Sequence, residues 1–295
     1  MRGNSMTAIA LKNLERRLGK FTLGPLTLSV PRGSVLAFIG PNGAGKTTTL
    51  DLLMGLGSAD GGSIEILGLM MPRDEVAIKL KTAYVTPDLN FVPWGNVGRA
   101  LDFVSGFYPD WSETRCEKLL REFSIRRDER IATLSFGGRM KLSLVMALAR
   151  DAELLLLDEP TVGLDVNARL ALFGEILDFV KREDRTVVIS SHQLSDLERL
   201  ADHVAILDKG KLLVMDRMDA LVERYLQLDA RLVTGGALPA LDCVQLLEQD
   251  GARLRLLFDR KTASSHQLAQ FGIEILSETP MTLEELFMAL VAEKR

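Results

Sequence analysis

The glycine-rich stretch GPNGAGKTTTL, residues 40–50, constrains the fold of this chain more than any other feature. Glycine adopts backbone angles that other residues avoid, so such a loop lets a ligand reach the main-chain N–H groups. The preceding run, SVLAFIG, is typical of a buried strand, and the apolar spacing in TTTLDLLMGL is typical of a helix. A strand, a glycine-rich loop and a helix in this order predict a phosphate-binding P-loop.

The fixed positions of the P-loop pattern G-x-x-x-x-G-K-[ST] are all filled in this stretch. In that pattern, backbone N–H groups and the helix N-terminus hold phosphates, the lysine reaches the outer phosphates, and the hydroxyl binds Mg²⁺. We therefore expect a nucleotide and Mg²⁺ to bind here. The expected nucleotide contacts are Gly40, Pro41, Asn42, Gly43, Ala44, Gly45, Lys46, Thr47 and Thr48.

A pair of acidic residues follows the apolar run in AELLLLDEP. Asp158 and Glu159 come directly after a segment typical of a buried strand. In P-loop proteins an acidic residue at such a strand end holds Mg²⁺ beside the P-loop threonine. We therefore expect Thr47 and Asp158 to be the metal-binding residues, with Glu159 acting on the attacking water as general base.

Composition excludes several classes of protein. The chain has 295 residues, 47% of them apolar and 26% charged, which is typical of a soluble globular protein. A net charge of −4 provides no general basic surface, so we expect no nucleic-acid partner. Cys116 and Cys243 lie far apart and indicate a reducing compartment without a cysteine metal site. No stretch approaches the roughly 18 apolar residues of a membrane span, so work at a membrane requires a partner within it.

The order of strand and helix patterns predicts how the chain is divided. Alternating strands and helices around a P-loop predict a mainly parallel α/β core, which we assign to residues 7–95 and 150–227 after a disordered start over 1–6. Residues 96–149 are expected to form a mostly helical insert, the alternative being further core helix. Short strand patterns and a capped final helix predict a small α+β accessory domain over 228–295.

Three further motifs complete a family pattern. They are LSFGG at residues 134–138, GLD ending at Asp165, and SSHQ, which contains His192. With the P-loop and LLLLDEP, and in this order, they make residues 7–226 resemble the ATP-binding subunit of an ABC transporter. The resemblance implies a P-loop NTPase core in which Glu159, His192 and Lys46 are catalytic.

The resemblance also implies a site shared between two chains. ATP held by Lys46 of one subunit is then enclosed by Ser135 and Gly137 of a second copy or of a homologous ATPase subunit. The implied partner is an integral membrane transporter subunit, which places the chain at the inner face of the cell membrane. The appended C-terminal domain and the LSFGG sequence, which differs from the usual signature motif LSGGQ, resemble export-type subunits, whose membrane proteins are separate chains.

Three other functions compete with this interpretation. A DNA-associated ATPase of the same superfamily carries a long heptad insertion, and Lys46 and Asp158 are too close in sequence for one. A translation-associated ATPase usually has tandem nucleotide domains, whereas this chain has one P-loop and a net negative charge. A regulatory module that binds ATP without turnover is disfavoured by the presence of Glu159 and His192.

The chain departs from the family pattern at three places. The usual LSGGQ has Phe136 as its third residue here, and Pro87 stands where a glutamine is usual. Leu18 replaces the aromatic residue that usually stacks on adenine, and we expect Phe21 to substitute for it.

Aromatic residues gather between Pro87 and Trp111 and suggest a docking surface. Exposed aromatic side chains supply large apolar area at low entropic cost, although the same residues also suit the core of the insert. In the resembled family this part of the chain receives a helix of the membrane protein. We therefore expect Phe91 or Trp94 to contact the membrane partner.

Overall fold

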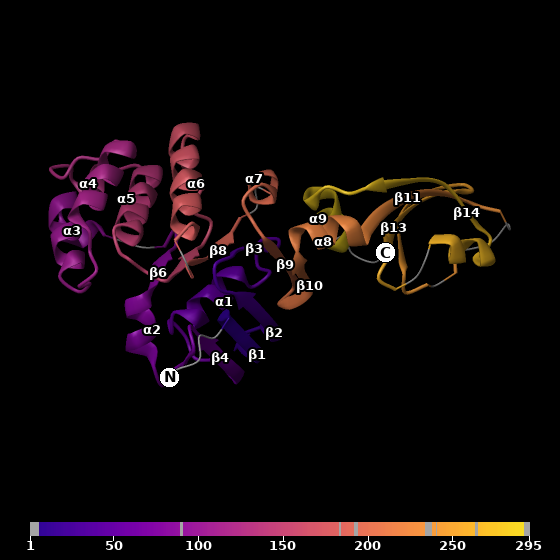
Figure 1. The fold of residues 1–295 in the computed structure, drawn as a ribbon, viewed down its shortest axis with the longest axis horizontal. Coiled ribbons are helices and arrows are strands. Elements are labelled where there is room, and N and C mark those ends of the chain that lie inside the picture. Colours follow the sequence, from indigo (N-terminus) through magenta and orange to yellow (C-terminus); the bar gives the residue numbers. More distant parts are fainter. Residues whose placement is uncertain are drawn as a thin grey trace. The chain divides into compact units, whose positions relative to one another are not determined.

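The chain forms two compact units, drawn together as a ribbon in Figure 1. The computed structural model describes residues 6–88, 91–182, 184–191, 194–233, 238–239, 241–262 and 265–291. The first unit comprises Met1–Gln193 and Arg199–Met215, and the second comprises Leu194–Glu198 and Asp216–Arg295. The second unit thus begins before residue 228, the start expected from sequence, which falls inside strand β11 (Tyr225–Leu232). The physical reason is that β11 places Leu228 in the core of the second unit.

A mainly parallel six-stranded sheet forms the centre of the first unit. Its strand order is β10-β9-β3-β8-β7-β6, and the β3·β8, β3·β9, β6·β7 and β7·β8 pairs are parallel. Every residue of β3, β7 and β8 is buried, as expected for a parallel sheet covered on both faces. The strands are β3 (Val35–Ile39), β6 (Thr82–Val85), β7 (Leu154–Leu157), β8 (Thr186–Ser190), β9 (His203–Asp208) and β10 (Lys211–Arg217).

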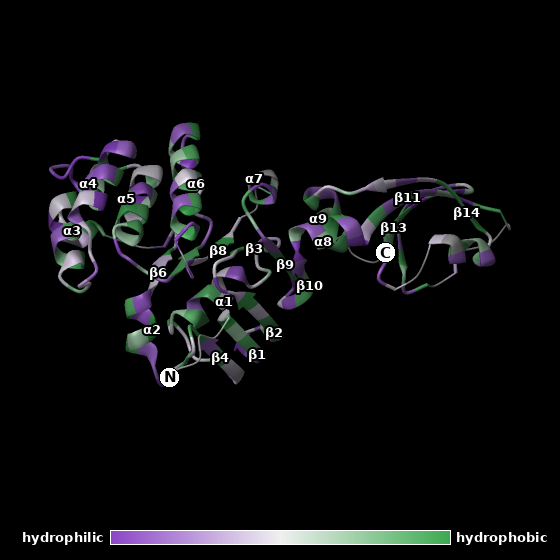
Figure 2. Ribbon diagram, in the orientation of Figure 1, coloured by the Kyte–Doolittle hydropathy of each residue, from purple (hydrophilic) through white to green (hydrophobic). Residues whose placement is uncertain are grey.

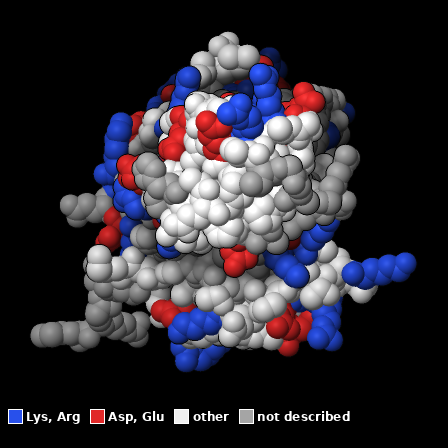
Figure 3. Space-filling view, turned by 90° about the vertical axis from the view of Figure 1, so that its right-hand side faces the viewer, with Lys and Arg blue, Asp and Glu red and all other residues white. Residues whose placement is uncertain are grey.

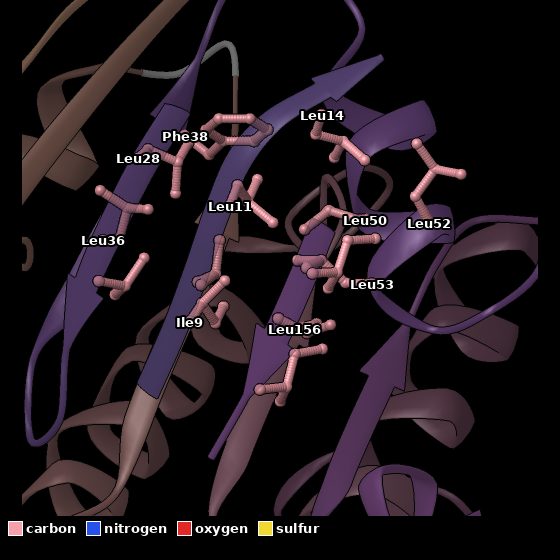
Figure 4. Packing of buried hydrophobic residues seen from close by; sticks show 14 of the residues in the cluster. Ile9, Leu11, Leu14, Leu28, Leu36, Phe38, Leu50, Leu52, Leu53 and Leu156 are labelled. Carbon is pink, nitrogen blue, oxygen red and sulfur yellow. The ribbon is translucent and has the colours of Figure 1, made fainter. Parts of the chain in front are cut away.

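A second, antiparallel sheet of the first unit has the order β2-β1-β4-β5. Along β2, buried and exposed residues alternate, which shows that one face is packed and the other faces solvent. The packed face contributes to a large cluster of buried leucine, isoleucine and phenylalanine side chains (Figure 4). The strands are β1 (Thr7–Leu18), β2 (Phe21–Pro31), β4 (Gly61–Ile66) and β5 (Leu69–Met70).

Helix α1 (Lys46–Leu53), which begins with the P-loop lysine, is anchored in that same cluster. Leu50 and Leu53 of α1 pack there with Leu11 of β1 and Phe38 of β3 (Figure 4). Because both sheets contribute to the packing around α1, the end of the helix that faces the glycine loop has a fixed position.

Three helices occupy the stretch expected to be a helical insert: α3 (Val97–Ser105), α4 (Glu113–Glu122) and α5 (Phe136–Leu148). Asn96, Ser112 and Ser135 cap them, each side chain accepting a backbone N–H from three residues further on. Helix α6 (Val166–Val180) follows β7 and appears in Figure 2 as bands of hydrophobic and hydrophilic residues. The shorter helices are α2 (Glu75–Lys81), η1 (Val92–Trp94) and η2 (Ile131–Thr133).

The second unit is built on an antiparallel sheet with the order β12-β13-β11-β14. It has its own core, which includes Leu228, Leu256 and Phe258. In Figure 3 the end of this unit shows uncharged residues across its middle and charged side chains near its rim. Its elements are α7 (Leu194–Glu198), α8 (Met218–Arg224), β11, β12 (Val244–Asp250), β13 (Arg253–Asp259), η3 (Ser265–Phe271), β14 (Ile273–Pro280) and α9 (Leu283–Val291).

Candidate nucleotide-binding site

The glycine loop lies between the end of β3 and the start of α1, as the sequence predicts. Gly45 precedes α1 with a φ of 105°, and no side chain of the described residues caps this helix. A Cβ on Gly45 would lie 2.6 Å from the Cδ1 of Leu23, and one on Gly40 would lie 2.4 Å from the carbonyl oxygen of Leu207. Glycine is therefore required at both positions, and the N–H groups at the start of α1 are not taken by a side-chain cap.

Lys46 points its ammonium group into the loop. Its Nζ donates to the carbonyl oxygens of Gly40 at 2.7 Å and Pro41 at 3.3 Å, and the residue is 6% exposed. The Oε1 of Glu159 lies 3.7 Å from the same Nζ. The structure thus brings together the two predicted catalytic residues that lie within its described part.

Thr47 and Asp158 meet directly at the start of α1. The Thr47 hydroxyl donates to Asp158 Oδ2 at 2.6 Å, and Asp158 is 2% exposed. Both side chains offer hard oxygen atoms, and the hydroxyl oxygen keeps lone pairs while its proton is shared with the carboxylate. These two residues fit the Mg²⁺ site expected from the sequence.

Ser190, which was not predicted from the sequence, forms hydrogen bonds with both Asp158 and Glu159. Its Oγ donates to Asp158 Oδ1 at 2.5 Å and accepts the backbone N–H of Glu159 at 2.9 Å. Glu159 has a φ of +46°, in the left-handed region that residues other than glycine rarely adopt. The only signal for Ser190 in the sequence is a polar residue that ends a buried strand.

Tyr84 and Asp51 form a second polar contact that the sequence did not predict. The Tyr84 hydroxyl donates to Asp51 Oδ1 at 3.0 Å, which links β6 to α1. Burial raises the pKa of Asp51; the Tyr84 hydrogen bond opposes this shift, and the charges of Asp158 and Asp88 add to it. Burial and the negative charge of Asp51 also raise the pKa of Tyr84, which keeps its hydroxyl protonated as a donor.

The LSFGG motif lies against the GLD motif of the same chain. Ser135 caps α5 by accepting the N–H of Gly138 at 3.0 Å. A Cβ on Gly137 would come within 2.1 Å of the carbonyl oxygen of Gly163, and one on Gly163 would lie 2.7 Å from the Phe136 ring. Lys141 and Asp165 add an ion pair at 2.7 Å. The Phe136 ring therefore lies against Gly163, next to the contact between the two motifs.

The remaining sequence predictions concern His192 and the aromatic residue expected to stack on adenine. His192 lies outside the described residues. Leu18 and Phe21 pair at the β1–β2 turn; Leu18 is 45% exposed, and the tip of the Phe21 ring would lie 3.1 Å from a Cβ on Gly45. Phe21 thus contacts the P-loop.

Comparisons with known proteins agree with this geometry. Residues 23–162 match the family described as ABC transporter. The ABC transporter ATP-binding protein YtrB of Bacillus subtilis is 28% identical over 290 residues, which cover 97% of this chain and 99% of that protein. The Nod factor export ATP-binding protein I of Bradyrhizobium diazoefficiens is 32% identical over an alignment of 304 positions, which covers 98% of each chain.

A solved structure described as the ATP binding subunit of an ABC transporter is also similar. Its TM-score is 0.68 at 28% identity, and the match covers 74% of this chain and 92% of that one. The predicted α/β P-loop fold and the predicted role as the ATP-binding subunit of an ABC transporter are thereby confirmed. The chain belongs to the ABC transporter family, as an ATP-binding subunit with ATPase activity.

Proposed function

We propose that this chain binds ATP with Mg²⁺ between two copies of itself, or between itself and a homologous subunit, and drives export through a separate membrane protein. The observation that carries the proposal is the meeting of Lys46, Thr47, Asp158 and Glu159 at the carboxyl end of β3 and β7. Subunits of this family work with membrane subunits and dimerise. The relative from Bradyrhizobium is named for export, which supports that direction of transport.

The roles of the residues follow from their positions. Lys46 provides a cation inside the glycine loop, where the outer phosphates of ATP carry negative charge. Thr47 and Asp158 would hold Mg²⁺, which when bound neutralises charge on the transferring phosphoryl group. Glu159 accepts a proton from the attacking water or orients that water. The role proposed for His192 rests on the SSHQ motif alone.

Ser135 and Gly137 are proposed to complete the site of a second subunit. They lie at the start of α5, a helix of 13 residues whose N-terminus favours an anionic ligand. The tight contact of Gly137 with Gly163 supports this proposal, because it couples the LSFGG motif to the loop that follows Glu159.

An exposed aromatic cluster is the proposed contact with the membrane partner. The ring centroids of Trp94 and Phe103 are 3.7 Å apart, and those of Phe103 and Phe107 are 4.9 Å apart. Phe103 is 47% exposed and Phe107 is 59% exposed, whereas Phe91 and Trp94 are half-buried. A cluster of this kind suits an apolar helix better than open water.

A buried arginine connects Tyr108, the residue after Phe107, to the core of the first unit. The Arg150 guanidinium lies 3.4 Å from the centroid of the Tyr108 ring, next to Phe107. It also donates to the carbonyl oxygens of Lys79, Leu80 and Thr82, at the end of α2 and the start of β6. Since Arg150 directly follows Ala149, the C-terminal cap of α5, it holds Tyr108, the end of α5 and the start of β6 together.

Phe107→Asp should weaken the complex with the cognate membrane protein by about tenfold or more, because it places a charge in an apolar contact. Co-purification from membranes measures the effect, and ATP binding by the isolated chain should stay unchanged. Leu276→Asp is the matched control, since Leu276 is 56% exposed in the second unit. Full recovery of the complex with Phe107→Asp would place the docking surface elsewhere.

The second unit is proposed to act as an accessory domain that contributes no residue to hydrolysis. Its core is made of its own residues, and the contacts among Lys46, Thr47 and Asp158 lie in the first unit. A chain that ends at Met215 should therefore bind ATP within about threefold of the full chain, which calorimetry can measure. Loss of binding by a truncated chain that still melts cooperatively would show that the second unit supports the site.

No helix among the described residues has both the length and the apolar character needed to cross a membrane. We propose, from the family membership of the chain, that a membrane partner supplies the transport path and holds this subunit at the cytoplasmic face.

A further inference from the structure

Ser190 occupies a central place in the main sheet. It is the last residue of β8, is fully buried, and pairs with Phe38 of the neighbouring strand β3. On its other side β8 is paired with β7, in a register that sets Leu157 beside Ile189. The residues that follow, Asp158 and Ser190, therefore meet at the carboxyl edge of the sheet, where ligands of such folds bind.

The Ser190 hydroxyl both donates and accepts a hydrogen bond. It donates its one proton to Asp158 Oδ1 at 2.5 Å, and Thr47 donates to the other carboxylate oxygen at 2.6 Å. With a donor on each oxygen, the Asp158 carboxylate cannot rotate without losing a hydrogen bond at a site that is 2% exposed. One hydroxyl from β8 and one from α1 thus fix its plane.

The same hydroxyl also stabilises the backbone conformation at Glu159. The Glu159 N–H donates to Ser190 Oγ at 2.9 Å, at a residue whose φ is +46°. Strained backbone of this kind persists where the surroundings hold it, and it gathers at functional sites. The bond to Ser190 holds the left-handed conformation and so directs the Glu159 side chain, whose Oε1 lies 3.7 Å from Lys46 Nζ.

We propose that Ser190 is a positioning residue for ATP hydrolysis. It acts through Asp158 and Glu159, fixing the carboxylate of the first and the direction of the second. The inference rests on the proposed function, because it needs Glu159 to act on the attacking water.

The test compares single-turnover hydrolysis and ATP affinity in full-length variants. Ser190→Ala should lower the rate about tenfold or more, because small displacements of reacting groups are costly, while the Kd for ATP changes less than about threefold. Ser190→Thr keeps the hydroxyl and should restore most of the rate. Thr186→Ala is the matched control, since it removes a fully buried hydroxyl at the other end of β8 and should leave the rate near normal.

Two measurements separate positioning from a general loss of structure. Ser190→Cys fills the space of the hydroxyl with a slightly larger group that hydrogen-bonds only weakly, so it should be slow like Ser190→Ala even if the alanine variant fails to fold. In the Glu159→Gln background, Ser190→Ala should cause a smaller further loss than in the wild-type background, because the part of its effect that acts through Glu159 is already removed and only the part through Asp158 remains.

The inference would be overturned if the rate reduction in the double variant equalled the product of the two single-variant reductions. A normal rate in folded Ser190→Ala and Ser190→Cys would also overturn it. Near-normal hydrolysis by the single Glu159→Gln variant would overturn the proposed general base first, so the two failures are distinguishable.

Discussion

Lys46→Ala is expected to abolish tight ATP binding, so isothermal titration should show Kd rising by about 10²-fold or more. A hydrogen bond to a charged group contributes about 1.5–3 kcal/mol, and 1.4 kcal/mol is a factor of ten in Kd. Lys46 Nζ sits among the loop carbonyls of Gly40 and Pro41, where it can form more than one such bond to phosphate oxygens. Its removal also leaves the multiple negative charge of ATP without a buried cation.

The matched control for this prediction is Lys79→Ala. Lys79 pairs with Glu75 one helical turn away, and its side chain is 37% exposed, so its loss should alter ATP affinity by less than about twofold. A thermal melt of both variants separates loss of binding from loss of fold. Unchanged affinity in a folded Lys46→Ala chain would contradict the assignment of residues 40–48 as the phosphate cradle.

The sequence could predict the residues of the site that belong to local patterns. Lys46 and Thr47 follow a glycine loop at fixed spacing, and Asp158 ends a run of leucines, so each is specified by its immediate neighbours. The parallel sheet was predictable for a similar reason. Continuous apolar runs such as those of β3 and β7 suit only strands that are buried on both faces.

The contacts made by Ser190 could not be predicted in this way. They depend on β8 lying beside β7 in one particular register, and a shift of one residue would turn Ser190 away from Asp158. The contact between Gly137 and Gly163 is of the same kind, because it joins segments from the insert and from the loop after β7. Sequence spacing carries no information about either contact.

The start of the second unit was misplaced for a related reason. The segment from 211 to 232 contains two strands, β10 and β11, separated by the short helix α8, and its sequence changes little in character. The difference lies in the partners of the strands. β10 joins the sheet of the first unit, whereas β11 pairs with β13 and β14 of the second.

Glu159→Gln is expected to slow ATP turnover by about 10²-fold or more while ATP binding persists. Glutamine keeps the size and reach of the side chain but cannot accept a proton from water. The substitution also removes a negative charge 3.7 Å from Lys46 Nζ. The lysine charge is then available to the phosphates of ATP, so the affinity for ATP should not fall. Steady-state phosphate release and calorimetric ATP binding measure the two effects.

The arrangement around Glu159 makes this test specific. Ser190 holds the backbone N–H of residue 159, an interaction that glutamine at this position retains, so the local geometry should survive the change. Glu278→Gln, at an exposed position of β14, controls for the loss of one charge and should turn over normally. If hydrolysis separates two copies joined by ATP, the slow variant should also accumulate as an ATP-dependent dimer in size-exclusion chromatography. Near-normal turnover by Glu159→Gln would remove Glu159 from the chemistry and leave its contact with Lys46 as a structural ion pair.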